Sequence, residues 1–185
     1  MTASVAQARR WTRSEFRKMA TAGIIHPEDR LELIEGEIVE MTPQSSLHST
    51  AVRKAEEALR VVFSSGYDVR AQLPLALGSL SEPEPDVAVV AGRIDDYRDA
   101  HPTTAVLVVE VADSSLAHDQ QLKAKLYASS DISEYWIVNL VDNCLEVHRD
   151  PVQGAYRSRS AYGQEDSLTP VAKPEASIPI SALLP

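Results

Sequence analysis

The chain has 185 residues, 44% of them hydrophobic, and a formal net charge of −9. This length suits one compact domain, and no apolar run approaches the roughly 18 residues that a membrane span needs. We therefore expect a single domain over residues 1–185 and no membrane contact. The negative charge argues against a large phosphate-binding surface of lysine and arginine, although a divalent cation held by carboxylates would supply the missing positive charge.

The N-terminus and the cysteine content bear on the compartment. The opening residues MTASVAQARRWTR contain no apolar core of the kind that a secretory signal needs. Cys144 is the one cysteine, so neither an internal disulfide nor a cysteine metal cluster is available. These features predict a cytoplasmic protein in a reducing compartment.

Two segments carry the signals of helices. Thr12 and Glu15 have the spacing of a capping box, so a first helix is expected to run to about Ala22, within an N-terminal segment of residues 1–25. Residues 46–64 carry apolar side chains at helical spacing, which predicts an amphipathic helix. These apolar positions are Ala51, Val52, Ala55, Ala58, Leu59, Val62 and Phe63.

Two segments in the first half predict β-strands. LELIEGEIVEM, residues 31–41, indicates two short strands with a tight turn at Glu35 and Gly36, because glycine accepts a positive φ. YDVRAQLPLALG, residues 67–78, alternates with the period of a half-buried strand. Pro74 predicts that this strand lies at an edge or contains a bulge.

The second half alternates apolar strands with a helix. DVAVVAG, residues 86–92, and AVLVVEVA, residues 105–112, are short apolar runs typical of central strands. A helix over about residues 119–129 and an apolar strand over residues 132–140 follow. The pieces CLEVHRD, YRSRSAY and SIPISALLP predict short closing strands or extended segments. This order predicts an α/β sheet with helices packed on it.

Two carboxylates accompany the apolar strands. Strand alternation places Glu110 on the same side as Val108 and Ala112, and Asp86 opens the preceding strand directly after Pro85. A carboxylate in an apolar place is costly unless it is paired, hydrogen-bonded or bound to a metal. A shared Mg²⁺ or Mn²⁺ would relieve the repulsion between two of them. The alternative for Asp86 is a loop aspartate that caps a turn after proline.

The helix after the second strand adds charged residues on one face. Asp119, Lys123 and Tyr127 follow one another at intervals of four residues. Lys123 could reach the carboxylates, where an ammonium would stabilise developing negative charge or orient an attacking water. The alternative is a surface ion pair between Asp119 and Lys123 worth about 0.3 to 0.5 kcal/mol. Tyr127 would then lie at the edge of the core with its hydroxyl in water.

Several motifs occur in a recognisable order: LELIEGEIVEMTP, PEPDVAVV, VLVVEVADSS, HDQQLKAKLY and EYWIVNL. With them the chain resembles the Uma-two family of restriction-endonuclease-like proteins, within the PD-(D/E)XK nuclease superfamily, over about residues 30–140. The resemblance implies a restriction-endonuclease-like α+β core over residues 30–150, with a mixed central sheet flanked by helices, and closing strands and a tail over residues 151–185. It also implies a divalent metal held by an aspartate and a glutamate.

The resemblance assigns roles to individual residues. Asp86 matches the family's proline-aspartate element and Glu110 its second acidic residue. The lysine expected two positions after that glutamate is replaced by Ala112. Lys123 stands where the Uma-two pattern has its lysine, so the lysine role is expected to lie on the helix. Lys125 is the weaker candidate, because it points about 200° away from Lys123 on a helix.

Three further residues match the family pattern around this site. Glu32 corresponds to a glutamate in the first strand of the hairpin and would add a carboxylate, whereas Glu35 is expected in the turn. His48 could contact a phosphate or carry a proton, although a lone histidine at a helix start is more often a cap or surface residue. Gln72 resembles a polar residue that could hold a metal-bound water.

Two functions remain open from the sequence. The first is a Mg²⁺-dependent endonuclease acting on DNA, in which Asp86, Glu110 and the Val111 carbonyl hold Mg²⁺ or Mn²⁺ and Lys123 assists an activated water. The second is a binding or regulatory module that keeps the nuclease fold without turnover, which the net charge of −9 favours. The two acids and the candidate lysine favour the enzyme. A homodimer is compatible with either function and would suit a two-strand cut.

Overall fold

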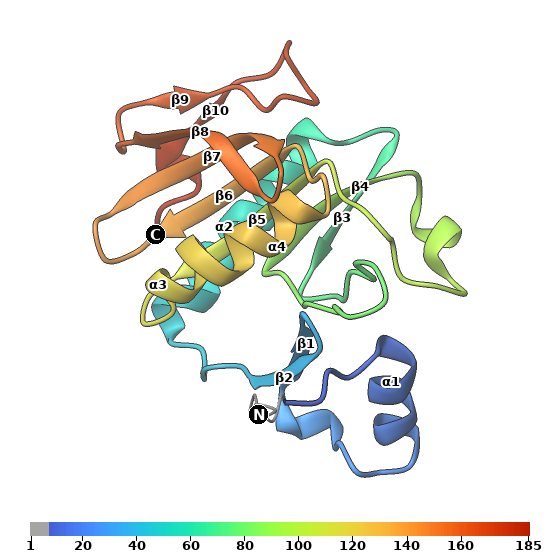
Figure 1. The fold of residues 1–185 in the computed structure, drawn as a ribbon. Helices are drawn as coiled ribbons and strands as arrows, with labels where there is room; N and C mark the ends of the chain where they lie inside the picture. Colours follow the sequence, from blue (N-terminus) through green and yellow to red (C-terminus); the bar gives the residue numbers. More distant parts are fainter. Residues whose placement is uncertain (1–7) are drawn as a thin grey trace.

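The computed structural model describes residues 8–185 and contains a six-stranded sheet with helices on both faces (Figure 1). The helices are α1 (Arg13–Thr21), α2 (Ser46–Val62), α3 (Leu116–His118) and α4 (Ala124–Ser129), and a π-helical turn over Asp119–Lys123 joins the last two. Short 3₁₀ turns lie at Pro27–Asp29, Ile94–Tyr97 and Ile180–Ala182. The strands are β1 (Leu31–Ile34), β2 (Glu37–Glu40), β3 (Tyr67–Ala71), β4 (Val87–Ala91), β5 (Leu107–Ala112), β6 (Glu134–Asn139), β7 (Cys144–Val152), β8 (Ala155–Tyr162), β9 (Ser167–Leu168) and β10 (Ile178–Pro179).

The central sheet is mixed. Its strand order is β3, β4, β5, β6, β7, β8. Only the β5 and β6 pair is parallel, and the other four pairs are antiparallel. The parallel pair requires a crossover, which α3, the π-helical turn and α4 provide. The predicted class, an α+β fold with a mixed sheet, an N-terminal helix and a β-hairpin, is therefore confirmed.

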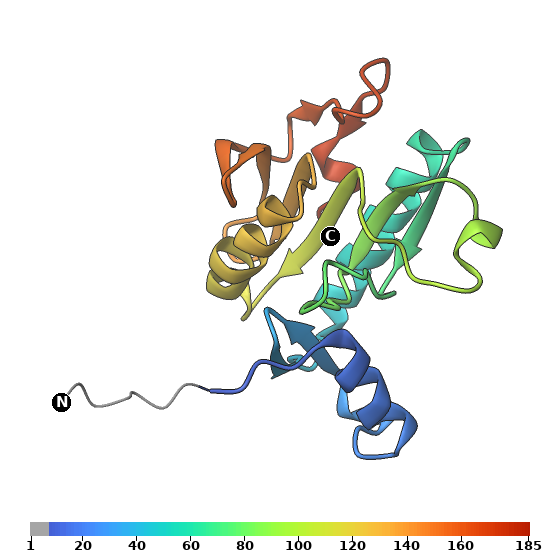
Figure 2. The same cartoon turned by 45° about the vertical axis from the view of Figure 1, so that its right-hand side comes forward.

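Strand β5 divides the core into two apolar layers. Leu107, Val109 and Val111 belong to the cluster that includes the buried face of α2, whereas Val108 and Ala112 belong to the cluster that includes α4. The two helices accordingly cover opposite faces of the sheet (Figures 1 and 2). All six residues of β5 are buried, as expected for a strand that is covered on both sides. The alternation predicted for this strand is confirmed.

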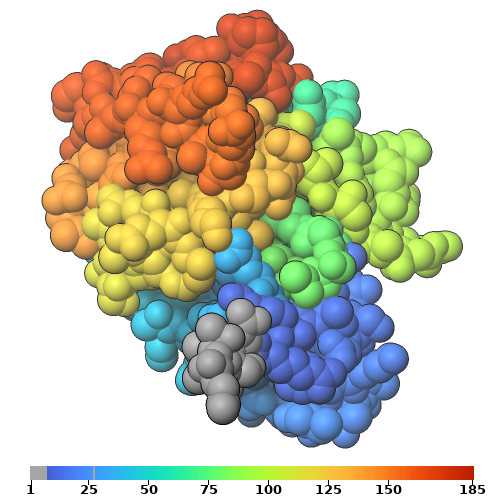
Figure 3. Space-filling model, in the orientation of Figure 1, coloured from blue at the N-terminus to red at the C-terminus, as the bar shows by residue number. Residues whose placement is uncertain are grey.

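The N-terminal segments form a unit beside the sheet. Glu15 N–H donates to Thr12 Oγ1 and Thr12 N–H donates to Glu15 Oε2, so the predicted capping box is present at the start of α1. Glu35 and Gly36 take φ values of 47° and 82° in the turn between β1 and β2, as the hairpin prediction requires. Figure 3 shows these segments packed against the rest of the molecule. The hairpin thereby brings β1 to the segment before β4, where Glu82 N–H donates to Leu33 O.

The strand predicted over residues 67–78 is wrong beyond Ala71. Gln72 takes a left-handed φ of 52°, and its N–H donates to the Asp86 carbonyl at 3.1 Å. The chain therefore leaves the sheet, although Leu75 and Leu77 remain buried. The predicted edge position is correct, because β3 is the first strand of the sheet.

Two other boundaries differ from the predictions. The helical segment starts at Leu116 rather than at residue 119, and it includes the π-helical turn. The predicted short closing strands include two long ones, β7 and β8, which extend the main sheet as a hairpin. Within residues 8–185, no helix has the length and apolar character needed to cross a membrane.

Candidate active site

Asp86 and Glu110 lie opposite each other where β4 meets β5. Val87 pairs with Val109 in the antiparallel register, and the next step along this register joins Asp86 to Glu110. Val111 N–H donates to Asp86 Oδ2 at 2.8 Å, and Asp86 N–H donates to Glu110 Oε2 at 3.3 Å. The two residues are only 7% and 4% exposed. The backbone of the neighbouring strand therefore fixes each carboxylate, and Asp86 does not serve as a cap for its own turn.

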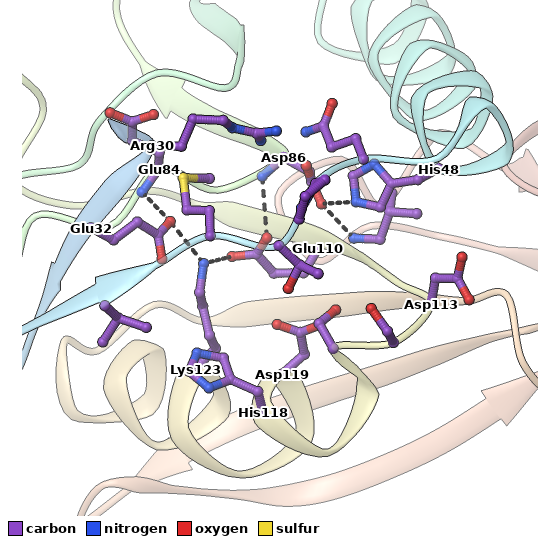
Figure 4. A pocket seen from close by; sticks show the side chains of 18 of the residues that line it. Arg30, Glu32, His48, Glu84, Asp86, Glu110, Asp113, His118, Asp119 and Lys123 are labelled. Atoms are coloured by element: carbon purple, nitrogen blue, oxygen red, sulfur yellow. Dashed lines mark hydrogen bonds and ion pairs between the residues drawn. The ribbon is translucent and has the colours of Figure 1, made fainter. Parts of the chain in front are cut away.

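Lys123 brings an ammonium group to these carboxylates from the helical crossover. Its Nζ lies 3.0 Å from Glu110 Oε1 and 3.0 Å from Glu32 Oε1 (Figure 4). Lys123 is 6% exposed and Asp119 is 4% exposed, so the alternative of a surface ion pair between them is wrong. The π-helical turn places both side chains against the sheet, and such turns occur frequently at functional sites.

Lys125 lies on the exposed side of the same helical segment. Its Nζ lies 3.0 Å from Glu35 Oε1, and its side chain is 58% exposed. The prediction that Lys125 points away from Lys123 is therefore confirmed.

Tyr127 joins the site although its predicted role was different. Its hydroxyl donates to Glu110 Oε1 at 2.6 Å, and the residue has no exposed surface. The predicted position at the core edge with the hydroxyl in water is wrong, because the whole face of α4 that carries Tyr127 is buried against the sheet. The interval of four residues after Lys123 was the sequence signal for this contact.

The hairpin contributes Glu32 to the site. Glu32 is buried, and its Oε1 accepts hydrogen bonds from Lys123 and from the Glu84 N–H, the latter at 2.8 Å. Glu84 also contacts this site, although the sequence analysis gave it no role. Its burial, together with the charge of Glu32, raises the pKa of the Glu84 carboxyl. The contact depends on how the hairpin docks against the PEPD segment, which local sequence patterns do not specify.

His48 and Gln72 approach Asp86 from outside the sheet. The His48 backbone N–H donates to the Ser45 cap of α2, while its Nε2 lies 3.2 Å from Asp86 Oδ2. Its Nδ1 is buried and has no hydrogen-bond partner among residues 8–185. Burial lowers the pKa of His48, but the contact with Asp86 outweighs burial and the net shift is upward. Gln72 Nε2 donates to Asp86 Oδ1 at 3.4 Å, a long and weak bond.

A cavity of about 280 Å³ that is rich in negative charge is lined by Glu32, His48, Asp86, Glu110 and Lys123. Its basic residues are Arg30 and Lys123, beside His48 and His118. The carboxylates in its wall are Glu32, Glu40, Glu84, Asp86, Glu110, Asp113 and Asp119. An unbalanced acidic wall of this kind attracts cations.

Burial, together with neighbouring charges, changes the ionisation of two carboxylates in this wall. Burial and the charge of Asp86 raise the pKa of Glu110 to about 8, although Lys123 acts in the opposite direction. Burial also raises the pKa of Asp119 to about 6, against a hydrogen bond from Ser115 Oγ at 2.6 Å. A cation close to these groups would favour their ionised forms.

The donor chemistry at the β4–β5 junction suits a hard divalent cation. Mg²⁺ prefers oxygen ligands and commonly takes one or two carboxylates from the protein, with waters or substrate oxygens completing its shell. Asp86, Glu110 and the Val111 carbonyl are oxygen donors of this kind at the cavity wall. Within residues 8–185, no group of three or more His, Cys, Asp and Glu side chains is arranged to hold a metal by itself. Two carboxylates and a backbone carbonyl match the few protein ligands that Mg²⁺ commonly takes.

The chain shares its fold with a solved structure. Its structure is similar to a crystal structure from Anabaena variabilis that is described as "a putative nuclease belonging to DUF820". The TM-score is 0.71, the sequences are 18% identical, and the match covers 93% of this chain and 96% of that one. At this level of identity the likeness shows the fold alone.

The family follows from the sequence comparison. A family model named Uma2 and described as "Putative restriction endonuclease" matches residues 13–181. The chain therefore belongs to the Uma2 family, as the motifs from LELIEGEIVEMTP to EYWIVNL predicted. No curated protein matches the chain.

Proposed function

We propose that this chain is a divalent-metal-dependent endonuclease that hydrolyses phosphodiester bonds in DNA. One observation carries the proposal: two buried carboxylates, Asp86 and Glu110, lie opposite each other beside the buried ammonium of Lys123 at the wall of a cavity. Burial of such a cluster is costly and has no evident benefit for packing alone. The chain belongs to a family that is described as "Putative restriction endonuclease", which supports the same conclusion.

The proposed metal ligands are Asp86, Glu110 and the Val111 carbonyl. Mg²⁺ or Mn²⁺ bound there would lower the pKa of a coordinated water and polarise a phosphoryl oxygen. Asp86 lies directly before β4 and Glu110 lies within β5, and backbone N–H groups fix both carboxylates. Asp86 Oδ2 accepts the Val111 N–H and Glu110 Oε2 accepts the Asp86 N–H, so the strand register itself orients the carboxylates.

Lys123 supplies the fixed positive charge for the reaction. The structure shows hydrogen bonds from Nζ to two carboxylate oxygens, and an ammonium has three donors. The third is available to stabilise negative charge on the phosphate as it develops. Ala112, two residues after Glu110, has no group that could take this role, and the crossover helix delivers the lysine to Glu110 instead.

The remaining polar residues have one of two proposed roles: proton transfer, or positioning of the charged groups. His48 lies against Asp86 on the side away from Lys123, and a histidine there is suited to carry a proton to or from solvent. Glu32 and Tyr127 hold Lys123 and Glu110 through hydrogen bonds. Gln72 donates a weak hydrogen bond to Asp86 Oδ1 and thereby helps to orient the Asp86 carboxylate.

The second candidate is a binding or regulatory module without turnover. The acidic cavity favours it, because seven carboxylates against two basic side chains repel a polyanion unless cations intervene. The two candidates differ in one respect that is simple to measure. Only the enzyme converts supercoiled plasmid to nicked or linear DNA when Mg²⁺ or Mn²⁺ is added.

The test is a nicking assay with matched variants. We expect the wild type to nick supercoiled DNA with Mg²⁺ or Mn²⁺, and Asp86→Asn, Glu110→Gln and Lys123→Met to be slower by at least about 100-fold. Lys125→Met removes the same charge two residues away from the site and should retain the wild-type rate. Nicking that is equal in all variants would come from a contaminant, and the absence of nicking on any nucleic acid would support the module.

A homodimer belongs to the same proposal. A nuclease that cuts both strands of a duplex benefits from two active sites related by a twofold axis, and such dimers are the commonest symmetric assembly. Light scattering on the purified chain would give twice the monomer mass if this is correct, and the monomer mass of 20.3 kDa if it is not.

A further inference from the structure

The ammonium of Lys123 occupies the space between two carboxylates. Its Nζ lies 3.0 Å from Glu32 on the hairpin and 3.0 Å from Glu110 on β5 (Figure 4). The lysine comes from a third element, the π-helical turn, so three segments that are distant in sequence converge on one positive charge. A position between two carboxylates from different elements is also the kind of place where a divalent ion binds.

Both carboxylates are held in place around this charge. Glu32 Oε1 also accepts the Glu84 N–H at 2.8 Å, and Glu110 Oε1 also accepts the Tyr127 hydroxyl at 2.6 Å. Each of the two oxygens that face Lys123 thus accepts a second donor from the protein. A metal ion at the same place would have to displace the ammonium and then compete with these donors.

The other side of Glu110 is different. Asp86 accepts hydrogen bonds from Val111 N–H and Gln72, and it contacts His48. Within residues 8–185, no lysine or arginine forms an ion pair with Asp86. The space between Asp86 and Glu110 Oε2 therefore has two carboxylates and no resident ammonium or guanidinium group, which distinguishes it from the space between Glu110 and Glu32.

We propose that Lys123 takes the place of a second metal ion, so that each chain binds one divalent cation, at Asp86 and Glu110. The proposal rests on the metal site of the proposed function and goes beyond it by fixing the number of ions. The side of Glu110 that faces Glu32 is closed to metal by a charge that belongs to the protein. In the resulting site one mobile cation and one tethered cation flank the same glutamate.

Manganese titration of the full-length chain tests this proposal. Isothermal titration calorimetry with Mn²⁺ alone should give one strong site per wild-type chain, and the electron paramagnetic resonance spectrum should be that of an isolated Mn²⁺ ion. Lys123→Met should gain a second equivalent and the spectrum of a coupled Mn²⁺ pair, because Glu32 and Glu110 are then free of the ammonium. Lys123→Arg keeps the charge and should bind one ion, as should the matched control Lys125→Met.

The outcomes separate this proposal from the proposed function. Two strong Mn²⁺ sites in the wild type, or one site in a folded Lys123→Met chain, would overturn the role assigned to Lys123 without affecting metal dependence. If Lys123→Met does not fold, the wild type and Lys123→Arg decide, since both must bind one ion. No binding of Mn²⁺ by the wild type would contradict the metal site itself. One bound ion without DNA cleavage would leave this inference intact and contradict the enzyme.

Discussion

Two buried ionic clusters lie on opposite faces of the central sheet. The Glu110 cluster consists of Glu32, Asp86, Glu110 and Lys123 on the α4 side. The Glu134 cluster consists of Glu134, Trp136, Arg149 and the Val171 N–H on the side of α2, where Trp136 belongs to the apolar layer. Both bury a glutamate in a β-strand, so burial alone does not distinguish them.

The Glu134 cluster is balanced. Glu134 Oε1 accepts the Trp136 indole N–H at 2.9 Å and the Arg149 Nε–H at 2.8 Å, and Oε2 accepts the Val171 N–H at 2.8 Å. Arg149 also donates to the Thr169 carbonyl at 2.7 Å, which ties the C-terminal segment to the sheet. One carboxylate meets one guanidinium, and every donor comes from the protein. Such a cluster stabilises the fold and requires no ligand.

The Glu110 cluster is unbalanced and faces a cavity. Glu32 and Glu110 share the ammonium of Lys123, Asp86 has no lysine or arginine partner among residues 8–185, and the wall adds further acidic groups. A buried charge therefore points to function when the protein itself leaves it with an excess of like charge at an accessible surface.

Loss of Arg149 should have the largest effect on stability. Arg149→Ala leaves Glu134 buried without its counter-charge, which costs about 3 to 5 kcal/mol of unfolding free energy. Urea denaturation measures this loss, with Arg157→Ala on the exposed face of β8 as the control. Mn²⁺ affinity of the folded variant should be unchanged. A loss below about 1 kcal/mol would mean that the Glu134 cluster is not the structural one.

Asp119 should make stability depend on pH. Its folded pKa of about 6 lies above the unfolded value of 3.8, so the folded chain holds the extra proton between these values. The contribution to stability is complete below about pH 4 and is lost as pH rises through about 6, by up to about 3 kcal/mol. Asp119→Asn should reduce the loss of unfolding free energy between pH 4 and 7, to which Glu110 also contributes, whereas Asp113→Asn at an exposed position should leave this loss unchanged. An identical slope in wild type and Asp119→Asn would contradict this ionisation.

Tyr127 should position Glu110 for metal. Tyr127→Phe removes one hydrogen bond to a carboxylate, worth about 1.5 to 3 kcal/mol, and should weaken Mn²⁺ binding by roughly 10-fold or more. Calorimetry at constant pH gives the dissociation constant, and circular dichroism checks that the variant is folded. Tyr156→Phe is the matched control, because Tyr156 is buried on the same face but donates to the Ile132 carbonyl. Equal loss of affinity in both variants would show a general packing effect.

Lys125 should have the smallest effect. Its ion pair with Glu35 has the same 3.0 Å separation as the contacts of Lys123, but the lysine is exposed. Lys125→Met should change the unfolding free energy by less than about 0.5 kcal/mol and leave Mn²⁺ binding unchanged. A large effect on either quantity would show that distance, rather than burial, determines the importance of these pairs.

Much of the fold could be predicted from local patterns. The capping box at Thr12, the hairpin turn at Glu35 and the alternation along β5 depend on residues close in sequence, and each is present in the structure. The end of β3 was missed because Gln72 adopts its left-handed φ against the carbonyl of Asp86, fourteen residues away. The local alternation of apolar and polar residues gives no information about a contact between residues so far apart in sequence.

The site residues likewise include some that the local sequence marks and others that only tertiary packing brings to the site. Glu110 interrupts an apolar strand and Asp86 directly precedes one, so the sequence marks them directly. Lys123 was ambiguous, since its spacing from Asp119 fits a surface pair equally well until the helix is known to be buried. Glu84 and Tyr127 contact the cluster through the docking of the hairpin and of α4. Their roles depend on tertiary packing, which cannot be predicted from the spacing of residues along the sequence.

We propose that the unbalanced Glu110 cluster is a metal-dependent active site. The most direct measurement is the rate of nicking of supercoiled DNA by wild type and Asp86→Asn, purified in parallel, as the Mg²⁺ concentration rises from zero. We predict a wild-type rate that rises with Mg²⁺ to a plateau, and a rate for Asp86→Asn lower by at least about 100-fold. Equal rates for the two proteins, or no nicking by the wild type at any Mg²⁺ concentration, would contradict the claim.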